Sequence, residues 1–128
     1  MRCAILSLVD AKKQGGAVKL HVDQVCWNVD SQPIITEICL EVHTGEFVGL
    51  IGPNGSGKST LLRCIYRALK PQAGYIGLDG DDLARLKPQQ AARRMAVVLQ
   101  ETTIPFDFTV REMVFMGRTP HKTLFEND

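Results

Sequence analysis

The sequence predicts an α/β fold in which a small antiparallel sheet precedes a strand–loop–helix unit. Two alternating apolar and polar runs within residues 18–42, separated by the turn-forming Asp30-Ser31-Gln32-Pro33, are typical of a hairpin with one wet face. Phe47–Ile51 is continuously apolar, as expected of a parallel strand covered on both faces. Apolar residues then recur at helical spacing through Ser59–Leu69, and Pro71 stops this helix.

The second half of the sequence predicts shorter elements. Ile76 and Leu78 lie on one face of a short strand, and Gln89–Arg94 is a short helical piece. Met95–Leu99 is a second continuous apolar run, which predicts another buried strand. Thr109, with Glu112 as its capping-box partner, is expected to start a helix that reaches about Met116.

Length and composition set bounds on the class of protein. The chain of 128 residues is long enough for one domain, and its 45% hydrophobic and 23% charged residues are ordinary for a globular protein. A net charge of +1 gives no electrostatic case for nucleic acid or an anionic membrane as a main partner. The four cysteines form no C-x-x-C pair, which argues against zinc or a disulfide scaffold and fits a reducing cytosol.

The N-terminal segment is expected to lie outside the domain. The apolar stretch Cys3–Val9 is short and lacks a cleavage pattern, so it does not predict a signal peptide. No stretch approaches the roughly 20 apolar residues of a membrane span. We therefore expect residues 1–16 to be a disordered extension and residues 17–128 to form the domain, with no direct membrane span.

The strongest motif is a glycine-rich loop of the form G-x-x-x-x-G-K-[ST]. It comprises Gly52, Pro53, Asn54, Gly55, Ser56, Gly57, Lys58, Ser59 and Thr60. Its three glycines are expected to take positive φ, so that successive N–H groups point inward and bind phosphate at the start of the following helix. Lys58 would reach the β- and γ-phosphates, Ser59 would offer a hydroxyl to Mg²⁺, and Thr60 would bond the α-phosphate side.

The residues around this loop resemble a known family. Leu40–Leu62 looks like the Walker A region of ABC ATPases, and Pro71–Gly80 resembles their P-x-x-G-x-I-x-L-D-G segment. Val97–Gln100 resembles the strand that leads into their Q-loop. Thr109–Glu112, followed by Gly117–His121, is similar to importers of ferric siderophores, haem and cobalamin. The resemblance covers about residues 17–125.

The resemblance implies a P-loop NTPase core with a small antiparallel β-subdomain that binds ATP and Mg²⁺. The resemblance implies that Lys58 and Gln100 are the catalytic residues and that Ser59 and Gln100 bind the metal. Gln100 would also sense the γ-phosphate. The loop Glu101–Phe108 would meet a membrane-spanning permease subunit, and a second ATP-binding subunit would be a further partner. The implied location is cytoplasmic, peripheral on the inner face of the cell membrane.

The residue that stacks on adenine is left open by the sequence. Trp27 is the only large aromatic in the first strand region, and aromatic faces stack well on bases. The position usual in the family falls nearer Val29, on the same strand face. The alternative is that Trp27 simply covers the sheet.

Several family elements are missing from these 128 residues. There is no L-S-G-G-Q signature, no apolar strand ending in Asp-Glu (Walker B) and no later switch histidine. We therefore expect an incomplete fold, truncated before the helical subdomain and the Walker B strand, which is marginally stable or oligomeric and hydrolyses ATP very slowly. The hypotheses are the N-terminal part of an importer ATPase, a truncated nucleotide-binding remnant, or a non-transport ABC ATPase of repair or translation.

Overall fold

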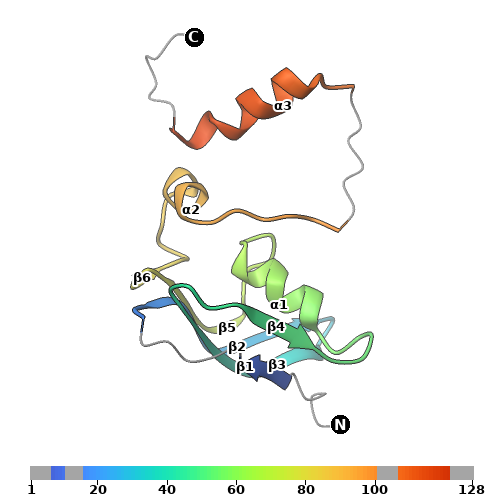
Figure 1. Cartoon of the computed structure of the whole chain (residues 1–128). Helices are drawn as coiled ribbons and strands as arrows, with labels where there is room; N and C mark the ends of the chain where they lie inside the picture. The colour runs from blue at the N-terminus through green and yellow to red at the C-terminus, as the bar shows by residue number, and fades with distance from the viewer. Residues whose placement is uncertain (1–6, 11–15, 101–106, 122–128) are drawn as a thin grey trace. The chain divides into compact units, whose positions relative to one another are not determined.

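The computed structural model describes residues 7–10, 16–100 and 107–121 (Figure 1). The chain divides into two compact units, residues 1–85 and 86–128, and each is described by itself. The first unit contains both sheets and the glycine-rich loop, and the described residues of the second form two short α-helices and a 3₁₀ helix.

The main sheet of the first unit is antiparallel and has the strand order β3-β2-β5-β6. Strands β2 (Val18–Val29) and β3 (Gln32–His43) form the predicted hairpin, which is confirmed. Its two-residue turn, Asp30 and Ser31, has φ values of 46° and 67°, as type I′ hairpin turns require. Strand β5 (Ala73–Leu78) pairs with the other edge of β2, and β6 (Asp81–Asp82) pairs with β5.

Two bulges in the hairpin set which residues face the core. Gln24 and Glu37 have positive φ of 48° and 49°, and the register shifts on both sides of the Val25–Ile38 pair. Cys39 Sγ accepts the Gln24 N–H and Cys26 Sγ accepts the Glu37 N–H, each at 3.2 Å. In a regular strand, residues 22 and 25 would point to opposite faces. Because of the bulge, both are buried.

Helix α1 (Lys58–Ile65) contacts β3 and completes the core of this unit. Leu61 and Cys64 are 0% and 1% exposed, and burial raises the pKa of the Cys64 thiol. The helix is shorter than the predicted Ser59–Leu69. It ends early because Arg67 takes a left-handed φ of 67° and Leu69 N donates to Arg63 O at 3.0 Å, a helix-ending geometry.

The strand that enters the glycine-rich loop differs from the prediction. Strand β4 (Val48–Ile51) pairs antiparallel with β1 (Ser7–Asp10), so the prediction of a parallel strand covered on both faces is wrong here. Phe47 is 81% and Ile51 is 54% exposed. Full burial requires neighbours on both edges and both faces, and within residues 7–10, 16–100 and 107–121 β4 has one strand partner. Strand β1 falls inside the predicted extension 1–16, and the domain boundary at residue 17 stays a prediction.

The second unit has the predicted helices but lacks the predicted strand. Helix α2 (Pro88–Arg94) and helix α3 (Val110–Gly117) are present, and the short 3₁₀ helix η1 (Thr119–His121) contacts both. The segment 95–99 forms no strand, and Val98 is 98% exposed, so the prediction of a buried strand there is wrong. An apolar run becomes a strand only when another strand pairs with it, and the described residues provide no such partner.

The capping box of α3 is confirmed. Glu112 Oε2 accepts the Thr109 N–H at 2.7 Å, and Thr109 Oγ1 accepts the Glu112 N–H at 3.3 Å. These bonds with Thr109 hold the pKa of the Glu112 carboxyl below its usual value. No helix in the described parts of the chain is long and apolar enough to cross a membrane.

Candidate functional site

The glycine-rich loop joins β4 to α1 and turns sharply. Ser56 N donates to Pro53 O at 3.2 Å, which closes the turn. Gly55 and Gly57 have φ of 81° and 89°, a region that side chains strongly disfavour. Gly52 is not in this region, so the expectation of positive φ holds for two of the three motif glycines.

Gly57 is also fixed by a close approach to the sheet. A Cβ atom at Gly57 would lie 2.5 Å from Ile35 Cγ2 and 3.0 Å from Ile34 O. Strand β3 therefore lies directly against the start of α1. Ile35 is in register with Trp27 on the neighbouring strand β2. The loop thus contacts the β3 residue that is directly opposite Trp27 in the sheet.

The start of α1 has the features of an anion site. Gly57 is its N-cap residue, no side chain caps the helix, and the first turn contains no acidic residue. The first N–H groups of a helix have no partner within the helix and lie at the positive end of its dipole. Ser59, which is exposed, and Thr60, which is half-buried, are the second and third residues of the helix, so both belong to this first turn. A phosphate group fits this arrangement.

The side chain of Lys58 lies over the loop that precedes it. Its Nζ donates to Gly52 O and Pro53 O, both at 2.7 Å, and to Ser56 Oγ at 3.3 Å. An ammonium group has three protons, so these bonds use all of them. Ser56 is only 5% exposed, and Lys58 provides its hydroxyl with a partner. The lysine charge is therefore held at the mouth of the loop, where the β- and γ-phosphates were predicted to bind.

A magnesium ion fits this site only when the phosphates of a nucleotide supply most of its ligands. In the described residues no cluster of three or more His, Cys, Asp and Glu side chains could hold a metal ion. Mg²⁺ commonly binds through substrate phosphates and one or two protein oxygens. The exposed Ser59 hydroxyl at the helix start can supply such an oxygen.

The other predicted site residues belong to β2, to the loop itself and to the second unit. Trp27 is half-buried in β2, and Val29, two residues later, is 43% exposed. Pro53 and Asn54 are exposed at the tip of the loop. Gln100 is exposed in the second unit, so its role at the γ-phosphate stays a prediction. The segment after it, residues 101–106, lies outside the described residues.

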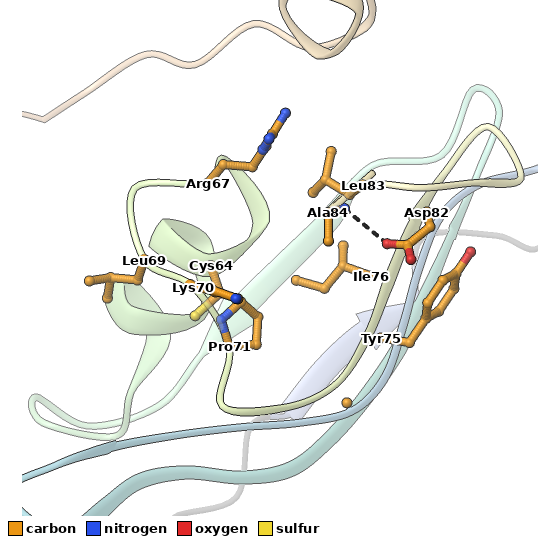
Figure 2. Close-up of a pocket in the computed structure, with 11 residues that line it drawn as sticks. Cys64, Arg67, Leu69, Lys70, Pro71, Tyr75, Ile76, Asp82, Leu83 and Ala84 are labelled. Carbon is orange, nitrogen blue, oxygen red and sulfur yellow. Dashed lines mark hydrogen bonds between the residues drawn. The ribbon is translucent and has the colours of Figure 1, made fainter. Parts of the chain in front are cut away.

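A pocket of about 460 Å³ lies at the other end of α1 (Figure 2). Its lining includes Cys64, Lys70, Tyr75 and Leu83, and Asp82 at its edge accepts the Ala84 N–H at 2.9 Å. No residue of the glycine-rich loop lines it. Phosphate sites of this kind are surface loops rather than enclosed cavities, so the loop, and not this pocket, is the candidate site.

Comparison with known proteins agrees with the geometry of the loop. Residues 35–127 match the family model described as "ABC transporter". The chain belongs to this family. The fold class predicted from the sequence, a P-loop α/β core with a small antiparallel β-subdomain, is confirmed as part of an ABC ATP-binding domain.

Several curated relatives are named as ATP-binding proteins of import or transport systems. The chain is 44% identical over 95 residues to the cobalamin import ATP-binding protein BtuD of Halobacterium salinarum, covering 74% of this chain and 24% of the relative. It is 37% identical over 107 residues to the ferric enterobactin transport ATP-binding protein FepC of Escherichia coli, covering 84% and 40%. It is 41% identical over 98 residues to the hemin import ATP-binding protein HmuV of Pseudomonas entomophila, covering 77% and 38%. The predicted resemblance to this importer subgroup is confirmed.

Solved structures place the fold in the same family. One, described as the ATP binding subunit of an ABC transporter, superimposes with a TM-score of 0.73 at 27% identity, over 80% of this chain and 42% of that one. A bacterial Atm1-family ABC exporter with ATP bound superimposes with a TM-score of 0.54 at 32% identity, over 58% and 13%. The chain spans between about a quarter and two fifths of the length of the three curated relatives above.

Proposed function

We propose that this chain binds MgATP through Gly52–Thr60, as the N-terminal part of the ATP-binding subunit of an ABC importer. The observation that carries the proposal is the uncapped start of α1 with the Lys58 ammonium held beside it. Together they provide N–H donors, a helix dipole and a positive charge at one place. In this proposal Lys58 binds the β- and γ-phosphates, and Ser59 and Gln100 contact Mg²⁺.

The proposed cargo is a metal chelate such as a ferric siderophore, haem or cobalamin. The support is the set of relatives, which are named for import of cobalamin and hemin and for transport of ferric enterobactin. The proposed partners are a membrane-spanning permease, bound through residues 101–108, and a second ATP-binding subunit. This places the proposed site of action at the cytoplasmic face of the cell membrane.

Turnover by these 128 residues is proposed to be very slow. Phosphoryl transfer needs several groups positioned at once, and the chain carries only the loop and Gln100 among those the family uses. The alternative function, a nucleotide-binding remnant without transport, predicts the same binding and slow turnover. Reading the coding sequence after the codon for Asp128 separates the two, because only the importer subunit continues into the signature and Walker B motifs.

The binding proposal is tested by substituting Lys58. Lys58→Ala is expected to raise the Kd for MgATP by about 100-fold or more, because it removes a charge-assisted phosphate contact. Lys70→Ala is the matched control, since Lys70 is exposed near the other end of the same helix segment. Isothermal titration of both variants and the wild type measures the effect. Unchanged affinity in Lys58→Ala, or equal losses in both variants, contradicts the phosphate-loop assignment.

A further inference from the structure

Gln72 makes an unusual pair of hydrogen bonds to the end of β2. Its Oε1 accepts the Asn28 N–H at 2.6 Å, and its Nε2 donates to Asn28 O at 3.2 Å. The two residues are 44 positions apart in sequence. A single side chain therefore holds both backbone groups of one strand residue.

This pair continues a strand ladder that the backbone itself cannot continue. The β2–β5 pairing ends at Cys26 and Ala73, and Gln72 N donates to Cys26 O at 3.0 Å. The next residue back along the chain is Pro71, which has no N–H to donate. A carboxamide presents a C=O and an N–H side by side, as a peptide group does. The Gln72 side chain thus extends β5 by the equivalent of one residue.

The other edge of β2 makes this extension more important. Asn28 is opposite Pro33 of β3, and a proline provides no N–H for the ladder. The last residues of β2 would be expected to fray without a second partner, because they lie next to the hairpin turn. The two hydrogen bonds between Gln72 and Asn28, which we call the Gln72 clamp, supply that partner for the segment Trp27–Val29.

This segment is the part of β2 that faces the phosphate loop across one strand. Trp27 is in register with Ile35, and a Cβ on Gly57 of the loop would lie 2.5 Å from Ile35 Cγ2. Both candidates for stacking on adenine, Trp27 and Val29, flank the clamped Asn28. We propose that Gln72 is a positioning residue for the base of the bound nucleotide: it fixes the Trp27–Val29 segment relative to the phosphate loop. This inference rests on the proposed function.

The test compares two ligands that share their phosphates but differ in the base. MgATP would contact both the phosphate loop and the Trp27–Val29 segment, here called the adenine platform. Magnesium tripolyphosphate has no base and would contact the loop alone. Gln72→Ala is expected to weaken MgATP binding by about five- to tenfold, since a misplaced platform loses contact energy without losing the phosphates. Tripolyphosphate affinity is expected to stay within about twofold of the wild type.

Two further variants make the result specific to the clamp. Gln72→Glu keeps the shape and one acceptor but removes the Nε2 donor, and it sets a carboxylate oxygen against Asn28 O, so it should lose at least as much MgATP affinity as Gln72→Ala. Gln32→Ala, at the other side of the same hairpin end, is the control and should bind both ligands normally. Acrylamide quenching of Trp27, the only tryptophan in the chain, should increase in both Gln72 variants.

The outcomes are distinguishable from a failure of the proposed function. Equal losses for MgATP and tripolyphosphate in Gln72→Ala, or unchanged MgATP affinity, overturn the positioning role. A wild-type chain that binds neither ligand overturns the phosphate site itself and the inference with it. Selective loss of MgATP affinity, with normal tripolyphosphate binding, supports both.

Discussion

Among the described residues, most of the fully buried apolar side chains lie in the first unit and few lie in the second. In the first, Ile35 and Leu61 are fully buried between the antiparallel sheet and α1. In the second, Val98 and Val110 are 98% and 82% exposed, and α3 has no buried residue. The second unit has the better capped helices, since α2 and α3 both have capping boxes whereas no side chain caps α1, so local signals do not explain the difference. Burial separates them, because burial requires strand partners that are distant in sequence.

The largest expected effect tests this contrast directly. Leu61→Ala removes buried carbons from the core of the first unit and should lower the free energy of unfolding by about 2–5 kcal/mol. Val98→Ala removes carbons that are already in water, and should change it by no more than about 0.5 kcal/mol. Urea unfolding followed by circular dichroism measures both. Similar effects for the two variants would show that Val98 is buried in solution.

A second test replaces a glycine in each unit by the same residue. Gly57→Ala forces a Cβ against Ile34 O and Ile35 Cγ2 at a φ of 89°, which should destabilise the first unit by about 1–3 kcal/mol. Gly117→Ala adds its Cβ at the end of α3, where no described atom lies within 4 Å apart from its chain neighbours and the backbone of its own helix. There the change should be neutral or stabilising by up to about 1 kcal/mol. Thermal unfolding of the two variants gives the comparison, and a destabilised Gly117→Ala would contradict it.

The smallest expected effect lies within the second unit, where the two helices have different caps. Glu112 caps α3 through Thr109, and Gln90 Oε1 accepts the Lys87 N–H at the start of α2 at 3.0 Å. The pKa of Glu112 is lowered by the Thr109 bonds, so its cap is fully formed above the usual glutamate pKa. The stabilisation is lost as the pH falls through the lowered value. Gln90 does not titrate, so α2 should keep its cap.

Amide chemical shifts of Thr109 and Lys87, followed through an acid titration, measure this difference. The Thr109 shift should titrate below the usual glutamate range, while the Lys87 shift should not follow that curve. Glu112→Gln is the matched variant, because it keeps an acceptor oxygen and removes the charge. If the Thr109 shift still titrated in that variant, another carboxylate would be responsible.

The same contrast explains what the sequence could and could not predict. The hairpin and the Thr109 cap depend on a few adjacent residues, and both are confirmed, as is the family to which the loop motif pointed. The continuous apolar run 95–99 predicts burial, but the pattern does not identify the strand that would have to pair with it. Two positive-φ positions, Arg67 at the end of α1 and Gln24 at the bulge in β2, are not glycines, so the sequence gives no local signal for them.

The Gln72 clamp could not be predicted for a related reason. A glutamine beside a proline is an ordinary loop residue, and only the register of β2 against β5 brings its carboxamide to Asn28. The contact of Gly57 with β3 is similar, since the motif explains its φ but not its neighbour. Side-chain contacts across long sequence separations follow from the assembled sheet and not from any local pattern.

The three bonds that Lys58 makes to its own loop change how a substitution at this position acts. In the wild type, an incoming phosphate oxygen must replace Gly52 O, Pro53 O or Ser56 Oγ as the acceptor of a Lys58 N–H, so binding exchanges one acceptor for another. In Lys58→Ala those acceptors lose their donor before any nucleotide arrives, and the loop is free to relax. The measured loss of affinity is therefore the sum of a missing contact and a reorganised loop. Lys58→Arg, which keeps the charge and the donors on a larger planar group, separates the two contributions.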